Sequence, residues 1–296
     1  MCLIIAIALA MQPNPAGLRR LYEDGLRRRE QQYGLSDIRT ARAARDLGQF
    51  LRELGDAGGA RKALEETLAI DEKALGPTVA ATLADAGELA AVSAPGEAEP
   101  LWRRAAESPD AGVAAWALAA LGELREAAGD RDGAVPFYRQ ALAKEEVASG
   151  KEGARVAVRL NALGLALGPE TGIPLLTRAV EIDRRAWGER HPETATAETN
   201  LSGLLLAAGR TEEAVRLGRA ALAGFEATLG GDHPRTAGAA SNLADALRAK
   251  GDRAGAERLY RRALDIDERA YGPQHPETLN DARNLTEFLQ EAGRAK

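Results

Sequence analysis

Histidine is the residue type most able to do chemistry in this chain, and its 296 residues contain three. Imidazoles bind metal ions and transfer protons near neutral pH. His191, His233 and His275 recur every 42 residues, each with Gly three residues before it, Pro directly after it and Thr three residues after it. Packed helices lie about 8–10 Å apart, whereas zinc needs ligands at about 2 Å. Histidines two helices apart cannot share one site, so we expect structural residues at helix starts.

The sequence offers no other catalytic or metal-binding constellation. Its single cysteine, Cys2, excludes a disulfide within the chain and a thiolate cluster for zinc. It has no glycine-rich phosphate loop, nucleophile elbow or metal motif, and no spaced pair of carboxylates stands out. We therefore predict a protein that is not an enzyme and uses neither cofactor nor metal.

The composition is that of a folded helical protein. Apolar residues make up 45% of the chain but aromatic residues only 4%, and no β-branched or aromatic run alternates as a strand would. Charged residues make up 28% with both signs interspersed, and the net charge is −5. This balance argues against nucleic acid or an anionic membrane as the main partner.

Residues 1–12 form an apolar segment that begins "MCLIIAIALA". The small residues Ala8 and Ala10 around Leu9 fit a signal-peptidase site, which favours a secretory leader and an exported or periplasmic protein. The segment lacks the usual positive charge and is shorter than the roughly 20 residues that span a bilayer. The alternative is a capping turn over the first repeat of a cytoplasmic protein.

The segments that follow the three histidines repeat one another and each predicts a pair of helices. Each begins with a proline, where the first helical turn lacks a partner for its N–H in any case. Each has Asn-Leu eight residues later and, nine residues after the Asn, a Gly suited to end a helix. These positions are Pro192, Pro234 and Pro276, then Asn200, Asn242 and Asn284, then Gly209, Gly251 and Gly293.

The same pattern continues upstream with more variation in sequence. A Leu or Val followed eight residues later by Gly recurs from Leu26/Gly34 to Leu264/Gly272, and "IDEKALG", "IDRRAWG" and "IDERAYG" are near copies. We predict a leading helix within residues 13–35, then about six helix pairs and a terminal capping helix over residues 36–296. The pairs begin near residues 36, 78, 110, 152, 192 and 234, and the pair around 78–107 is short.

This pattern resembles the tetratricopeptide repeat. The best example is Asn242-Leu243-Ala244, Gly251-Asp252, Ala256, Tyr260 and Ala263, and the 42-residue spacing is similar to that of kinesin light chains and their bacterial relatives. The resemblance covers roughly residues 16–293. It implies an all-α, right-handed α-solenoid whose first helices line a concave groove for an extended peptide. Stacked helix pairs also create such a surface on physical grounds, because one pair cannot bury its own apolar face.

The resemblance places Asn200, Asn242 and Asn284 in this groove, where amides can clasp a peptide backbone. The alternative is that they bond the adjacent first helix and stabilise stacking. Asp46, Asp85 and Asn161 are candidates at or near the same position. Arg42 and Arg45 share a helix face that could receive a carboxylate, although a solvated face is the plainer interpretation. Arg283, on the closing helix, completes the candidate set. Trp102, Trp116 and Trp187 are expected to pack in the core.

We therefore expect a monomeric scaffold that binds a protein or extended peptide. The rival hypothesis is a sensor domain, or less readily an enzyme, with a small-molecule pocket. A buried, convergent set of polar residues with shifted ionisation would favour that rival. A third possibility is a self-assembling array.

Overall fold

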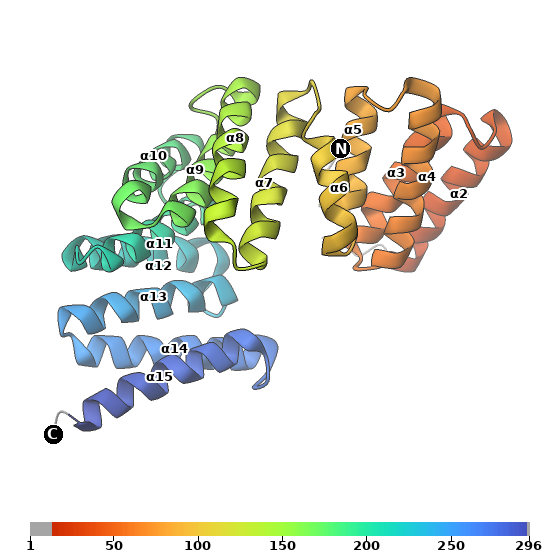
Figure 1. Ribbon diagram of the computed structural model, residues 1–296. Coiled ribbons are helices and arrows are strands. Elements are labelled where there is room, and N and C mark those ends of the chain that lie inside the picture. Colours follow the sequence, from red (N-terminus) through yellow and green to blue (C-terminus); the bar gives the residue numbers. More distant parts are fainter. Residues whose placement is uncertain (1–13, 295–296) are drawn as a thin grey trace. The chain divides into compact units, whose positions relative to one another are not determined.

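The computed structural model describes residues 14–294, and these residues form fourteen α-helices joined by short connections (Figure 1). No strand occurs in this part of the chain, so the predicted all-α class is confirmed there. The interpretation of residues 1–12 as a leader falls outside the described residues. Within residues 14–294, every helix is too short or too polar to cross a membrane.

The chain divides into two compact units, and the N-terminal unit ends at Lys144. Its leading helix α2 is followed by helices of uneven length, and the short predicted pair corresponds to α5 and α6, with eleven residues each. The helices are α2 (Pro15–Tyr33), α3 (Ile38–Glu53), α4 (Ala57–Leu75), α5 (Ala80–Ala90), α6 (Pro95–Ala105), α7 (Ala111–Ala127) and α8 (Arg131–Ser149), which crosses the boundary.

The C-terminal unit begins at Glu145 and contains seven further helices of the described chain. They are α9 (Ala154–Leu167), α10 (Pro169–Trp187), α11 (Pro192–Ala207), α12 (Thr211–Leu229), α13 (Pro234–Lys250), α14 (Arg253–Tyr271) and α15 (Pro276–Arg294). Each helix packs against the next one in the chain, and α11 also contacts both α9 and α13. First helices of successive pairs therefore lie side by side, as the stacked helices of this unit in Figure 1 illustrate.

Small residues allow the helices of a pair to approach closely. Ala214, Ala221, Ala256 and Ala263 on the second helices are fully buried. Between α9 and α10 the contact is tighter still, because a Cβ on Gly172 would lie 2.1 Å from the carbonyl oxygen of Gly164. Only glycine fits such an approach.

The recurring histidines cap the helices that they precede. The Nδ1 atoms of His191, His233 and His275 accept the backbone N–H two residues later, at 3.2, 3.1 and 3.3 Å. Asp37 occupies the same place before α3 and accepts the N–H of Arg39 at 2.9 Å. The unprotonated imidazole nitrogen thus replaces the side-chain oxygen that usually satisfies the free N–H groups of a first turn. This explains how histidine can occupy a position that capping statistics assign to aspartate or asparagine.

Two of the caps are reinforced by an aromatic ring from the preceding helix. His191 stacks on Trp187 with ring centroids 5.0 Å apart, and His275 stacks on Tyr271 at 4.3 Å. The expectation that Trp187 packs in the core is therefore wrong, since 50% of this residue is exposed. Its ring covers the histidine because the connecting turn brings the end of one helix against the start of the next. Trp102, by contrast, is buried edge-to-face against Trp116.

We predict that replacing His233 by Ala lowers the free energy of unfolding by about 1 kcal/mol, the usual effect of losing an N-cap acceptor. The variant His233→Asn should recover most of this loss, because its Oδ1 can accept the same N–H. Urea denaturation followed by circular dichroism measures both. Equal destabilisation by Ala and Asn would contradict the capping role.

Candidate functional site

The first helices of the C-terminal unit carry the predicted asparagine ladder. Asn200 lies on α11, Asn242 on α13 and Asn284 on α15. The Nδ2 of Asn200 donates to Oδ1 of Asn161 on α9 over 3.1 Å, and the Nδ2 of Asn284 donates to Oγ of Ser241 over 3.5 Å. Two ladder amides thus bond a neighbouring first helix, whereas Asn242 is exposed.

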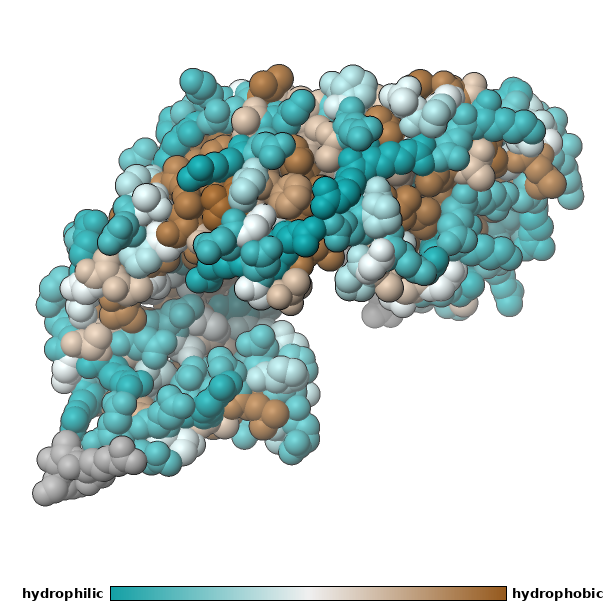
Figure 2. All heavy atoms as spheres, in the orientation of Figure 1, coloured by the Kyte–Doolittle hydropathy of each residue, from teal (hydrophilic) through white to brown (hydrophobic). Residues whose placement is uncertain are grey.

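Asn242 and Asn284 line one cavity of about 440 Å³, which we call the acidic pocket. It is formed by α13, the end of α14 and the start of α15, and its volume lies within the usual range for ligand sites. Hydrophilic side chains predominate on the face of these helices seen in Figure 2. Four carboxylates line the pocket together with the ladder amides and Asn280: Asp245, Asp267, Glu277 and Asp281.

Two of these carboxylates are buried with an oxygen that lacks a partner. Asp267 and Asp281 are each 5% exposed. Oδ1 of Asp281 accepts the hydroxyl of Ser241 over 3.0 Å, but its Oδ2 has no hydrogen-bond donor. Oδ1 of Asp267 also has none. An unpaired buried polar atom is destabilising. Four other buried carboxylates have such an oxygen, but each lies within 4 Å of an arginine nitrogen: Asp71, Asp85, Glu145 and Glu198.

Burial shifts the ionisation of the carboxyl groups in the acidic pocket. The pKa of Asp281 is raised to about 6, mainly by burial and with a contribution from the charges of Asp267, Glu277 and Asp245, whereas the hydrogen bond from Ser241 lowers it. Burial also raises the pKa of Asp267, with a further rise from Glu277 and a smaller lowering from His275. The charged forms are disfavoured as long as the pocket supplies no cation.

The acidic pocket contains little positive charge of its own. Among the described residues that line it, Arg235 carries the one permanent positive charge. Its guanidinium is already engaged, since it donates to Thr196, lies 3.5 Å from Glu193 and lies 5.1 Å from the ring centroid of Phe225. The buried carboxylates therefore face each other without a counter-ion.

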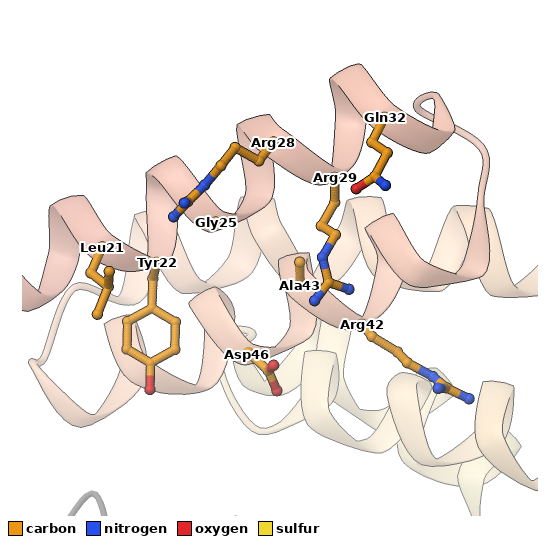
Figure 3. A pocket seen from close by; sticks show the side chains of 9 residues that line it. All are labelled: Leu21, Tyr22, Gly25, Arg28, Arg29, Gln32, Arg42, Ala43 and Asp46. Atoms are coloured by element: carbon orange, nitrogen blue, oxygen red, sulfur yellow. The ribbon is translucent and has the colours of Figure 1, made fainter.

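A second cavity, which we call the basic pocket, lies in the N-terminal unit between α2 and α3 (Figure 3). Its volume is about 400 Å³. Arg28 and Arg29 extend from α2 and Arg42 from α3, and Arg29 reaches toward α3 whereas Arg42 points away from Asp46. Burial raises the pKa of Asp46, and the charges of Arg45 and Arg29 lower it. Asp46 and Arg42 thus share this basic pocket.

Arg45 is committed to an internal ion-pair cluster. Its Nη2 lies 2.9 Å from Oδ2 of Asp71 on α4, and its Nε lies 2.6 Å from Oδ1 of Asp85 on α5. Both carboxylates are 1% exposed. Burial raises the pKa of Asp85 to about 7 despite the opposing charge of Arg45. Without this guanidinium the two buried carboxylates would repel each other.

The placement of Asp85 in the ladder register is wrong. It lies six residues after the N-cap Val79, whereas the ladder residues lie nine after theirs, so its side chain reaches the ion-pair cluster. Arg283 is exposed on α15 and donates to Oδ1 of Asn280 over 2.9 Å, beside the acidic pocket. The predicted residues therefore fall at three separate places: the ladder and acidic pocket, the basic pocket, and the ion-pair cluster.

The sequence reasoning missed the carboxylates of the acidic pocket. A signal was present, because the near copies "IDEKALG", "IDRRAWG" and "IDERAYG" place Asp71, Asp183 and Asp267 at one repeat position directly after a buried isoleucine. A charged residue next to a core residue in every copy indicates a polar group held at a helix interface. Within the described residues, no group of three or more His, Cys, Asp or Glu side chains is arranged to hold a metal ion.

Family models for the tetratricopeptide repeat match residues 40–78, 117–146, 165–227, 205–269 and 235–296. The chain belongs to the tetratricopeptide-repeat family. The tetratricopeptide fold is a general scaffold for protein interactions and is usually non-catalytic. No curated protein matches the chain.

Solved structures agree with a tetratricopeptide fold. The chain is similar to the Cut9–Hcn1 hetero-tetramer of APC/C, with TM-score 0.63 and 14% identity over 93% of this chain and 46% of the other. It is similar to PilF of Pseudomonas aeruginosa, with TM-score 0.55 and 17% identity over 81% and 95%. The nearly identical repeats of a putative kinesin light chain from Podospora anserina match with 22% identity over 77% and 95%, at TM-score 0.45.

We predict that Arg45→Met lowers the free energy of unfolding by roughly 3–5 kcal/mol, because it leaves two buried carboxylates without a cation. The loss should be larger at pH 8 than at pH 5, since the pKa of Asp85 is raised and protonation at the lower pH removes the repulsion. The control Arg52→Met breaks a more exposed ion pair, in which Arg52 lies 2.7 Å from Glu88. It should lower the free energy of unfolding by less than about 1 kcal/mol. Denaturant titrations at both pH values measure these effects, and equal losses in the two variants would contradict the cluster's role.

We predict the opposite sign for Asp281→Asn, which should raise the free energy of unfolding at pH 7.5 by about 2 kcal/mol. The pKa of Asp281 in the folded protein lies above that of an unfolded carboxyl group, so its ionised form destabilises the fold as the pH rises through about 6. Asn keeps the Oδ1 that accepts the Ser241 hydroxyl. The gain should shrink toward zero at pH 4, and a gain independent of pH would contradict this assignment.

Proposed function

We propose that this tetratricopeptide-repeat chain binds an extended segment of a partner protein along the first helices of its C-terminal unit. The observation that carries the proposal is that Asn242 of α13 and Asn284 of α15 line one pocket. An asparagine amide offers two donors and one acceptor, so amides on successive helices can bond the free N–H and C=O groups of an extended peptide.

The exposure of the pocket's lining supports a segment of chain as the occupant. Asn242, Asn280 and Glu277 line the acidic pocket and are exposed, while Asp267 and Asp281 lie buried at its base. A peptide backbone can thus lie across the exposed amides while one side chain enters the pocket.

A small cationic molecule is the second candidate ligand, because the pocket has the feature expected of a sensor domain. Its buried carboxylates converge and the pKa values of Asp281, Asp267 and Asp245 are all raised, mainly by burial. A sensor would recognise such a ligand without the ladder amides, whereas a peptide scaffold would require them. This difference separates the two functions experimentally.

We predict that Asn242→Ala combined with Asn284→Ala weakens peptide binding about tenfold, as expected for two lost hydrogen bonds. A library of extended peptides displayed on phage is first selected on the wild-type chain. Fluorescence anisotropy with one selected peptide then compares the variants. Thermal denaturation should place the double variant close to wild type, because both side chains lie at the surface of the pocket.

Arg258→Ala is the matched control, since Arg258 is exposed on α14 and does not line the pocket. It should bind like wild type. Unchanged affinity in the asparagine double variant, or melting far below wild type, would assign the ladder to helix stacking, the role already visible in the bond from Asn200 to Asn161.

A further inference from the structure

The acidic pocket is lined by two buried carboxyl groups, Asp267 and Asp281, that form no ion pair with an arginine or lysine in the described part of the chain. Oδ1 of Asp267 and Oδ2 of Asp281 are buried and receive no hydrogen bond. Two other buried carboxylates of the C-terminal unit have an arginine nearby, since Glu198 lies 2.5 Å from Arg184 and Glu145 lies 3.7 Å from Arg159. Asp183 resembles Asp267 instead, because burial and the charge of Glu193 raise its pKa to about 6. The acidic pocket differs from these places because it brings two such carboxylates to one cavity.

The N-terminal unit has two carboxylates at the same repeat positions, together with an arginine that bridges them. Counted from the helix N-caps, Asp71 and Asp85 occupy the repeat positions of Asp267 and Asp281. Arg45 lies eight residues after the N-cap Asp37 and bridges both carboxylates at 2.9 and 2.6 Å.

In the C-terminal unit the position equivalent to Arg45, eight residues after the N-cap His233, is Ser241. Its short hydroxyl donates to Oδ1 of Asp281 over 3.0 Å and supplies no charge. The C-terminal unit therefore has the same two carboxylates but a serine in place of the arginine that bridges them in the N-terminal unit. A cavity of about 440 Å³ lies beside these carboxylates.

We propose that the acidic pocket binds an arginine side chain of the partner segment, with its guanidinium bridging Asp267 and Asp281 as Arg45 bridges Asp71 and Asp85. This inference rests on the proposed function, because the arginine belongs to the peptide that lies across Asn242 and Asn284.

The chemistry of the pocket favours a guanidinium over other cations. A planar guanidinium donates five N–H groups in a fixed fork that suits carboxylates on two different helices, whereas an ammonium group is a compact, strongly hydrated point charge. The side chain of Tyr271 lines the same pocket and offers an aromatic surface to the cation and its stem. A metal ion is disfavoured, since no group of metal-ligating side chains is arranged for one among the described residues.

The test uses the full chain and a peptide already selected on it for the proposed function. If that peptide contains an arginine, the residue is replaced by citrulline, lysine or norleucine. If it does not, arginine, citrulline, lysine and norleucine are introduced at each position in turn. N-acetyl-arginine amide serves as a probe that carries the guanidinium without an extended backbone. Isothermal titration calorimetry at pH 7.5 measures each affinity.

Citrulline has the shape of arginine without its charge, so we expect it to bind at least tenfold more weakly than arginine, with lysine between the two. The double variant Asp267→Asn and Asp281→Asn should lose the preference for arginine while remaining folded, because it removes buried repulsion. Its matched control is Asp183→Asn. Asp183 occupies the same repeat position as Asp267 and is buried to a similar degree, but it does not line the acidic pocket. This control should keep the wild-type preference.

Ser241→Arg is a second test, because it places an arginine at the repeat position that Arg45 occupies in the N-terminal unit. Its guanidinium should fill the pocket, raise the melting temperature and reduce binding of the arginine peptide at least tenfold. Retained arginine binding in a folded Ser241→Arg chain would overturn the proposal. If this variant does not fold, the citrulline comparison on the wild-type chain still decides the matter.

Failure of this inference is distinguishable from failure of the proposed function. Peptide binding that depends on Asn242 and Asn284 but is equal for arginine and citrulline would leave the scaffold standing and overturn the arginine pocket. Binding of N-acetyl-arginine amide that requires Asp267 and Asp281, without any peptide binding, would support the guanidinium site and overturn the peptide scaffold.

Discussion

The constraint on which this structure depends is that a single pair of its helices cannot bury its own apolar face. Stacking on the next pair removes that face from water, which is why fully buried alanines such as Ala214 and Ala256 recur on the second helices. Stacking also sets the first helices side by side, as the contacts of α11 with α9 and α13 demonstrate. Residues distant in sequence but equal in repeat position are thereby brought to equivalent interfaces, and sites arise from the repeat itself.

Equivalent interfaces allow one position to be structural in one repeat and available for binding in another. The interface of α3, α4 and α5 contains Arg45 between two buried aspartates, and the interface of α13, α14 and α15 contains Ser241 beside two. The first is an internal ion-pair cluster of the kind that is strongly destabilised when one partner is removed. The second lacks its cation and has a cavity instead. The two interfaces differ at one repeat position, which is Arg45 in the first and Ser241 in the second.

Much of the fold follows from the sequence because its signals are local and repeated. The 42-residue spacing, the prolines after the histidines and the glycines after each helix predict the helix pairs in order, and the structure has helices at those places. The exposure of Trp187 could not be predicted from its repeat position, because that position is not equally buried in every repeat. Leu229 occupies the same position and is partly buried, whereas half of Trp187 is exposed. Stacking on His191 decides it, and a ring-on-ring contact across a turn depends on backbone geometry that composition does not reveal.

The site was harder to predict because its residues form a site only when the fold brings them together. Asn242 and Asn284 could be identified from the family pattern, but Asp267 and Asp281 are ordinary acidic residues until the fold buries them with unpartnered oxygens. Their burial raises their pKa values and so opposes folding at neutral pH. Replacing either by an uncharged residue would relieve this strain, and other repeats do have alanine or phenylalanine at these positions, as Ala239 and Phe225 show. A cluster that lowers stability and has simple alternatives within the same chain is better explained by a ligand that supplies the missing cation than by the needs of the fold.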